Sequence, residues 1–189
     1  RKVKILNGSH TAMVPVAYLC GIDTVRESVE DEDVGLFVNQ LINDVVKPTI
    51  NLPKYHMAAF ASSLMERFRY PYIRHELMSI SLNSTTKFRT RLLQTYNDYI
   101  EIFNKLPKHI LFSFASLITF YKGKRGDEDI ALNDDPQYLK FWKETWELGD
   151  YTSIAEKALS ASDIWGQNLA TEETIKLVSS YLEDINTNG

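Results

Sequence analysis

Apolar residues recur at helical spacing through most of this 189-residue chain, and no other feature restricts its fold as strongly. Apolar positions at i, i+3, i+4 and i+7 are typical of a helix with one buried face. Three stripes show this spacing: Val34, Phe37, Val38, Leu41, Ile42 and Val45; Ile110, Leu111, Phe114, Leu117, Ile118 and Tyr121; and Ile175, Val178, Leu182 and Ile185. The sequence therefore predicts a mostly α, multi-helical fold, and it contains no convincing strand pattern.

Local signals predict where several helices begin and end. Capping residues, first-turn prolines and a late glycine give these boundaries: a capping box of Thr24 and Glu27, a helix over 33–47 ended by Pro48, a helix from Pro53 to about Phe68, a helix opened by Pro107 and closed by Gly123, a cap at Asp135-Pro136, and a final helix capped by Thr171. The polar, glycine-containing segment from Lys122 to Asp135 is predicted to be a surface loop.

Composition favours one ordinary helical domain over residues 1–189. Hydrophobic residues make up 44% of the chain, enough for a domain of this length to bury its own core. We find neither a long repeat nor a Pro-, Gly- or Ser-rich linker that would divide it. The aromatic stripe and the tryptophans are predicted to be core: Phe112, Phe114, Phe120, Tyr121, Trp142, Trp146 and Trp165.

Charge and cysteine content narrow the class of protein. A net charge of −4 argues against a nucleic-acid partner, because such surfaces usually carry a basic excess. No apolar run approaches the roughly 20 residues of a membrane span, and no signal peptide is visible. The single cysteine, Cys20, suits a reducing compartment, so we expect a cytoplasmic protein. Because the chain starts at Arg1 and enters a patterned segment at once, we also expect a piece of a longer protein.

The first ten residues carry a candidate catalytic group. Asn7 and His10 are three residues apart and would share a helix face, with Lys2 just before them and Gly8 leaving space beside Asn7. Oxidation of an alcohol needs a base, and a lysine of lowered pKa can serve. Amide and imidazole N–H groups can stabilise the developing oxygen charge. The alternative is that Lys2 is solvated, Asn7 caps a helix and His10 is a core residue.

Three segments together resemble the C-terminal domain of the mannitol dehydrogenase family. These segments are K-x4-N-G-S-H-T from Lys2 to Thr11, the R-F-R-Y-P-Y-I run from Arg67 to Ile73, and the lysine segment from Leu82 to Arg91. The lysine segment is similar to the form found in the family's tagaturonate reductase (altronate oxidoreductase) branch. The chain departs from the family at Tyr70, where Asn commonly precedes the proline.

The resemblance implies a role for each matching residue. Lys2 would be the general base in oxidation and the acid in reduction, Asn7 would polarise the reacting oxygen, and His10 would hydrogen-bond the substrate. Lys87 would contact substrate hydroxyls or a carboxylate. The implied reaction interconverts D-tagaturonate and D-altronate with a lysine as general acid/base and without a metal.

A hexuronate substrate carries a carboxylate, which favours paired lysine or arginine side chains. Lys87 and Arg91 are four residues apart and would share a helix face, so they are the first candidates. His75 and Arg67 are weaker candidates for substrate binding. Arg89 fits a solvated basic face as well as it fits a carboxylate contact. His56 and His109 show no pattern beyond surface or structural roles, and Glu30 to Asp33 is predicted to be an acidic helix start.

The resemblance also implies a partner domain. The cofactor NAD would be bound mainly by an N-terminal Rossmann domain, because this chain contains neither G-x-G-x-x-G nor a βαβ pattern. We therefore expect the isolated chain to be catalytically silent.

Other functions stay open at this point. Within the family they are fructuronate reductase and mannitol or polyol 2-dehydrogenase, and outside it a non-enzymatic helical interaction domain. If Lys2, Asn7, His10 and Lys87 did not converge, the catalytic hypothesis would fail.

Overall fold

The computed structural model describes residues 6–50, 68 and 74–188, and most of them are helical, as the apolar spacing predicts. In chain order the helices and strands are α1 (Gly8–Leu19), α2 (Val25–Glu30), α3 (Glu32–Gln40), the π-helix η2 (Leu41–Val46), the 3₁₀-helix η3 (Lys47–Thr49), α5 (Leu77–Ser81), α6 (Ser84–Phe103), α7 (Lys108–Phe120), β1 (Lys124–Arg125), β2 (Glu128–Asp129), α8 (Pro136–Trp146), α9 (Tyr151–Ser160), α10 (Ser162–Trp165) and α11 (Glu172–Asn188).

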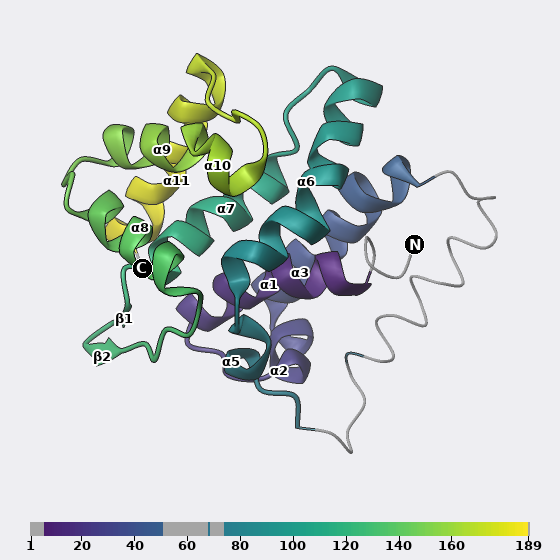
Figure 1. The fold of residues 1–189 in the computed structure, drawn as a ribbon. Coiled ribbons are helices and arrows are strands. Elements are labelled where there is room, and N and C mark those ends of the chain that lie inside the picture. The colour runs from purple at the N-terminus through teal and green to yellow at the C-terminus, as the bar shows by residue number, and fades with distance from the viewer. Residues whose placement is uncertain (1–5, 51–67, 69–73, 189) are drawn as a thin grey trace.

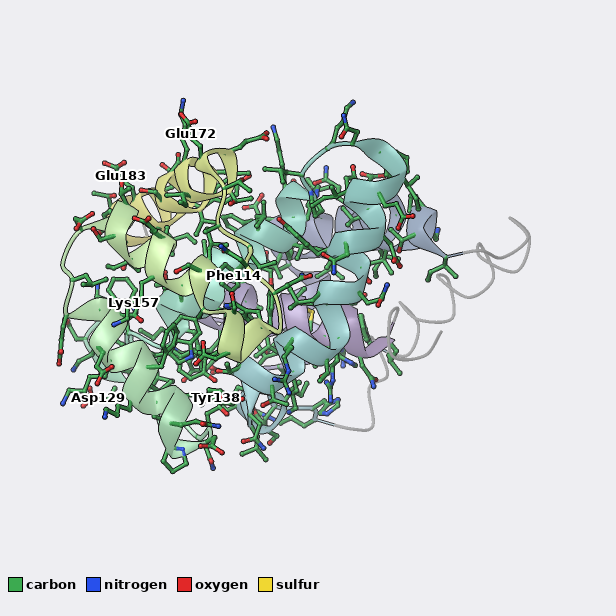
Figure 2. The ribbon with its side chains drawn as sticks, turned by 45° about the horizontal axis from the view of Figure 1, so that its top comes forward. Phe114, Asp129, Tyr138, Lys157, Glu172 and Glu183 are labelled. Atoms are coloured by element: carbon green, nitrogen blue, oxygen red, sulfur yellow. The ribbon has the colours of Figure 1, made fainter. Side chains whose placement is uncertain are left out.

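Helix α7 lies at the centre of the fold, between α1 on one side and α11 on the other (Figure 1). It is buried nearly all round, as expected for a helix that is apolar on every face. Figure 2 shows Phe114 of α7 among the helices, whereas Asp129, Glu172 and Glu183 lie on the outside. Six of the seven aromatic residues predicted to be core are confirmed as buried or packed against the core. The exception is Phe112, which is half-buried on α7 and contacts the rings of Phe37 and Tyr181.

Three predicted helix starts are confirmed by their capping hydrogen bonds. In each, a side-chain oxygen at the cap accepts a backbone N–H that has no partner within the helix. These bonds are Glu27 N to Thr24 Oγ1 (3.2 Å) for α2, Gln137 N to Asp135 Oδ1 (3.0 Å) for α8, and Thr174 N to Thr171 Oγ1 (3.1 Å) for α11. The acidic run is also a helix start, since Asp31 caps α3.

The helix predicted over residues 33–47 does not stay α-helical. Helix α3 ends at Gln40, and the chain continues as η2 and then η3, which contains Pro48. Proline has no N–H to donate, so α-helical hydrogen bonding cannot continue through it. The apolar face is nevertheless retained, because Leu41, Ile42 and Val45 are buried.

The prediction of a surface loop from Lys122 to Asp135 is wrong in part. Strands β1 and β2 pair antiparallel in this segment, with Lys124 opposite Asp129. Gly126 has φ +59° in the turn between them, a conformation that favours glycine. Strands of two residues leave no alternating pattern for sequence analysis to detect.

The helix predicted from Pro53 to about Phe68 lies outside the described residues, apart from Phe68, which is helical and 3% exposed. Among the described helices none is long and apolar enough to span a membrane.

Candidate active site

The first turn of α1 positions two of the predicted catalytic residues. Asn7 precedes the first residue of α1 with helical backbone angles (φ −73°, ψ −34°), and His10 follows within the first turn. Three residues apart in continuous helical backbone, their side chains project from the same face. Gly8 beside them is buried. Lys2 lies outside the described residues.

His10 has a partly buried ring with an unpaired nitrogen. Its Nε2 atom is buried and has no hydrogen-bond partner among the described residues. The ring centroid lies 4.4 Å from that of Phe68 and 5.8 Å from that of His75. Burial, followed by the nearby positive charges of His75 and Arg91, lowers the pKa of His10 to about 4. At neutral pH the ring is therefore uncharged, with one N–H donor and one acceptor nitrogen.

Lys87 and Arg91 lie one turn apart on α6, the helix that packs across α1 (Figure 1). The Lys87 Nζ atom donates a hydrogen bond of 2.7 Å to the carbonyl oxygen of Ile80 in α5. Burial, and next the positive charge of Arg91, lower the pKa of Lys87, while Asp134 opposes this shift. An ammonium group has three donors, so two have no partner among the described residues.

Arg91 connects α6 to the beginning of α1. Its Nη1 atom donates to the hydroxyl oxygen of Thr11 at 3.3 Å, and the Thr11 hydroxyl donates to the backbone carbonyl of Asn7 at 2.8 Å. Residues about 80 positions apart in the sequence are thereby joined at one place.

Positive charge at this place is not neutralised by an ion pair among the described residues, although the nearby Asp134 carboxylate acts to raise the pKa of Lys87. Asn7, His10, His75, Lys87 and Arg91 form what we call the α1–α6 cluster. Within the part of the chain that the structure describes, neither Lys87 nor Arg91 makes an ion pair with a carboxylate, although other surface cations do. Paired cationic donors that are not engaged in ion pairs are suited to bind an anion such as a carboxylate.

Two further basic residues, Arg89 and His109, make their described contacts outside the cluster. Arg89 is exposed on α6, and its Nη1 atom donates to the carbonyl oxygen of Ile164 at 3.2 Å. His109 contacts Gln40 at 3.2 Å, in keeping with the structural role predicted for it. Arg67, His56 and Tyr70 lie outside the described residues.

Sequence analysis missed the residue that caps α6. Asn83, the N-cap residue, has left-handed backbone angles and makes no capping bond with its side chain. Instead, buried Asp134 accepts the Thr85 N–H at 3.0 Å and the hydroxyl hydrogen of Tyr121 through the same oxygen. Burial and this bond to Asp134 raise the pKa of Tyr121. Asp134 lies 49 positions from Thr85, so no local sequence pattern identifies it as the cap of α6. Sequence analysis therefore assigned the polar segment that contains Asp134 to a surface loop.

Thr11 and Phe68 were also missed as site residues. Both stand inside the segments that suggested the family, but only the three-dimensional contacts with Arg91 and His10 reveal their roles. No group of three or more His, Cys, Asp or Glu side chains that could hold a metal occurs among residues 6–50, 68 and 74–188.

Comparisons with known proteins show which family the chain resembles over its whole length. The family model described as mannitol dehydrogenase C-terminal domain matches residues 1–186. An altronate oxidoreductase of Yersinia pestis is 38% identical over the whole chain, and one of Bacillus subtilis is 42% identical over the whole chain. This chain spans about two fifths of the length of these relatives (40% and 38%).

Solved structures show the same fold at lower sequence identity. The mannitol 2-dehydrogenase of Pseudomonas fluorescens, in a ternary complex with NAD and D-mannitol, matches with a TM-score of 0.87 and 20% identity. A substrate-free D-sorbitol dehydrogenase matches with a TM-score of 0.84 and 22% identity. Each alignment covers 100% of this chain and 38% of the other. From the family match over almost its full length, we conclude that the chain belongs to the mannitol dehydrogenase family, as its C-terminal domain.

Proposed function

We propose that this chain is the substrate-binding half of an NAD-dependent reductase that interconverts D-tagaturonate and D-altronate. The observation that carries the proposal is the α1–α6 cluster, where Arg91 reaches Thr11 in the first turn of α1 and Lys87 lies one turn away on α6, neither of them in an ion pair with a described carboxylate. A hexuronate brings the carboxylate that such a cluster lacks. The altronate oxidoreductases among its relatives support the same substrate class.

In this proposal three residues handle the proton and the reacting oxygen. Lys2 delivers a proton to the carbonyl oxygen during reduction and takes it back during oxidation. The Asn7 amide donates to that oxygen and stabilises its developing negative charge. His10 is neutral at physiological pH, because its pKa is about 4, and its ring can donate one hydrogen bond to the substrate.

The cofactor belongs to another part of the protein in this proposal. The only sheet among the described residues has two antiparallel strands, whereas a dinucleotide-binding fold needs a larger, parallel sheet. An N-terminal Rossmann domain would hold NAD and face the α1–α6 cluster. The chemistry that this cofactor supplies is hydride transfer, so reduction consumes one NADH and one proton for each alcohol formed.

A neutral polyol is the second candidate substrate, because the similar folds include mannitol and sorbitol dehydrogenases. Fructuronate is a further alternative that shares the carboxylate. A purely structural interaction domain is less well supported, because Arg91 bonds to the turn of α1 that carries His10, and the His10 ring lies beside His75.

A competition assay tests the proposal. The full-length protein that contains this chain is given NADH with tagaturonate, fructuronate and fructose in turn, and kcat/KM is compared. The proposal predicts tagaturonate to be preferred over the neutral fructose by at least about tenfold, since a buried charge-assisted contact is worth more than about 1.4 kcal/mol. A preference for fructose would contradict the hypothesis that the site binds a carboxylate. A preference for fructuronate would be consistent with a carboxylate-binding site but would identify a different substrate.

A further inference from the structure

The hydroxyl of Thr11 makes two hydrogen bonds that connect different parts of the site. It is 6% exposed and donates its single hydrogen to the carbonyl oxygen of Asn7, four residues earlier. Such a bond within one helical turn is common for threonine. The second bond is not local, because the same oxygen accepts from Arg91 on α6.

Contacts among the described residues leave most of the Arg91 guanidinium available. A guanidinium group carries five N–H donors, and among the described residues only Thr11 accepts from Arg91. The remaining donors can bind both oxygens of a carboxylate, provided that the side chain is held in one orientation. A long arginine side chain otherwise samples many rotamers, and fixing one of them costs conformational entropy on binding.

Resting on the proposed function, we propose that Thr11 is a positioning residue that holds Arg91 ready for the substrate carboxylate. Thr11 itself does not touch the substrate. Its hydroxyl fixes the guanidinium against the turn that carries Asn7, so the carboxylate contact and the reacting oxygen are held at a constant separation. Thr11 is therefore expected to favour charged hexuronates over neutral ketoses of the same carbon chain.

The test is a pair of complementary substitutions at Thr11 in the full-length protein. Thr11→Val removes the hydroxyl and keeps the shape, while Thr11→Ser keeps the hydroxyl. Thr90→Val is a matched control, because Thr90 is exposed on α6 and makes the same bond to a carbonyl four residues earlier, from its hydroxyl to Thr86 at 2.8 Å, without an arginine. KM and kcat are measured with tagaturonate and with a ketose in which a hydroxymethyl replaces the carboxylate.

We expect Thr11→Val to raise KM for tagaturonate about tenfold, with kcat and the KM of the neutral ketose nearly unchanged. Thr11→Ser and Thr90→Val should match the wild type. In an Arg91→Met background, Thr11→Val should have no further effect, because the two residues act as a unit.

Equal KM changes for both substrates, or none, would overturn the role of Thr11. If Thr11→Val does not fold, Thr11→Ala is measured in the wild-type and Arg91→Met backgrounds, where additive effects would overturn it. A wild-type protein that prefers the neutral ketose would instead refute the proposed substrate class, and the two failures are therefore distinguishable.

Discussion

His10 shows how burial determines the chemistry of one side chain. Its pKa of about 4 lies below the value of 6.5 that is ordinary for histidine, so the unfolded chain binds a proton more readily between these pH values. The contribution of neutral His10 to stability is therefore complete above about pH 6.5 and is lost as the pH falls towards 4.

We predict that the stability difference between the wild type and His10→Asn changes with pH. The wild type should lose up to about 3 kcal/mol relative to the variant between pH 7 and pH 4. Urea unfolding at several pH values measures the difference, and NMR of the His10 ring measures its titration midpoint. A midpoint near 6.5 would contradict the buried, uncharged ring.

Arg91 and Arg89 offer a matched pair on α6. Arg91→Met removes the guanidinium of the α1–α6 cluster, so KM for tagaturonate should rise about ten- to a hundredfold. Arg89→Met, two residues away and exposed, should leave KM unchanged. Steady-state kinetics of both variants in the full-length protein distinguish carboxylate recognition from a general effect of positive charge. Equal effects of the two substitutions would contradict the assigned role.

Part of the site could be predicted residue by residue. Spacing alone places Lys87 with Arg91, and Asn7 with His10, because each pair shares a helix face. Spacing does not reveal that α6 crosses the beginning of α1 or that Thr11 lies between them. Such contacts join residues far apart in the sequence and depend on how the helices pack.

At the scale of elements, α6 depends on a cap from outside its own sequence. Asp134 reaches the Thr85 N–H from the segment that precedes α8, and Trp142 of α8 donates to the Thr85 hydroxyl at 3.0 Å. This network fixes the start of the helix that carries Lys87. The start of α2, by contrast, is specified by a local capping box and was predictable.

We predict that Asp134→Ala lowers the free energy of unfolding by about 2–3 kcal/mol, because it leaves a buried N–H and a buried tyrosine hydroxyl without their acceptor. Asp127→Ala, at an exposed position in the same segment, should change it by less than about 0.5 kcal/mol. Urea denaturation followed by circular dichroism compares the two. Equal stabilities would show that the cap from Asp134 does not matter to the fold.

At the scale of the whole molecule, the helical class followed from apolar spacing, because a helix must bury one face against its neighbours. The π-helix η2 and the short hairpin of β1 and β2 could not be predicted from apolar spacing, since both are local adjustments to packing. The family resemblance depended on three separated motifs, and the match over residues 1–186 confirms it.

The chain alone should not oxidise NADH in the presence of tagaturonate, because in our proposal the cofactor is held by another domain. The measurement is the NADH absorbance at equal concentrations of the isolated chain and the full-length protein, after circular dichroism shows that the isolated chain is helical. Turnover by the isolated chain would refute the two-part organisation.

The most direct test of the central claim is the rate of tagaturonate reduction by the full-length protein, with Lys2→Ala compared against the wild type and against Lys4→Ala. A general acid/base lysine predicts that Lys2→Ala lowers kcat by about 10²–10⁴ with little change in KM, while Lys4→Ala is unaffected. Near-normal turnover of Lys2→Ala would contradict the proposed mechanism and leave the resemblance as evidence for the fold alone.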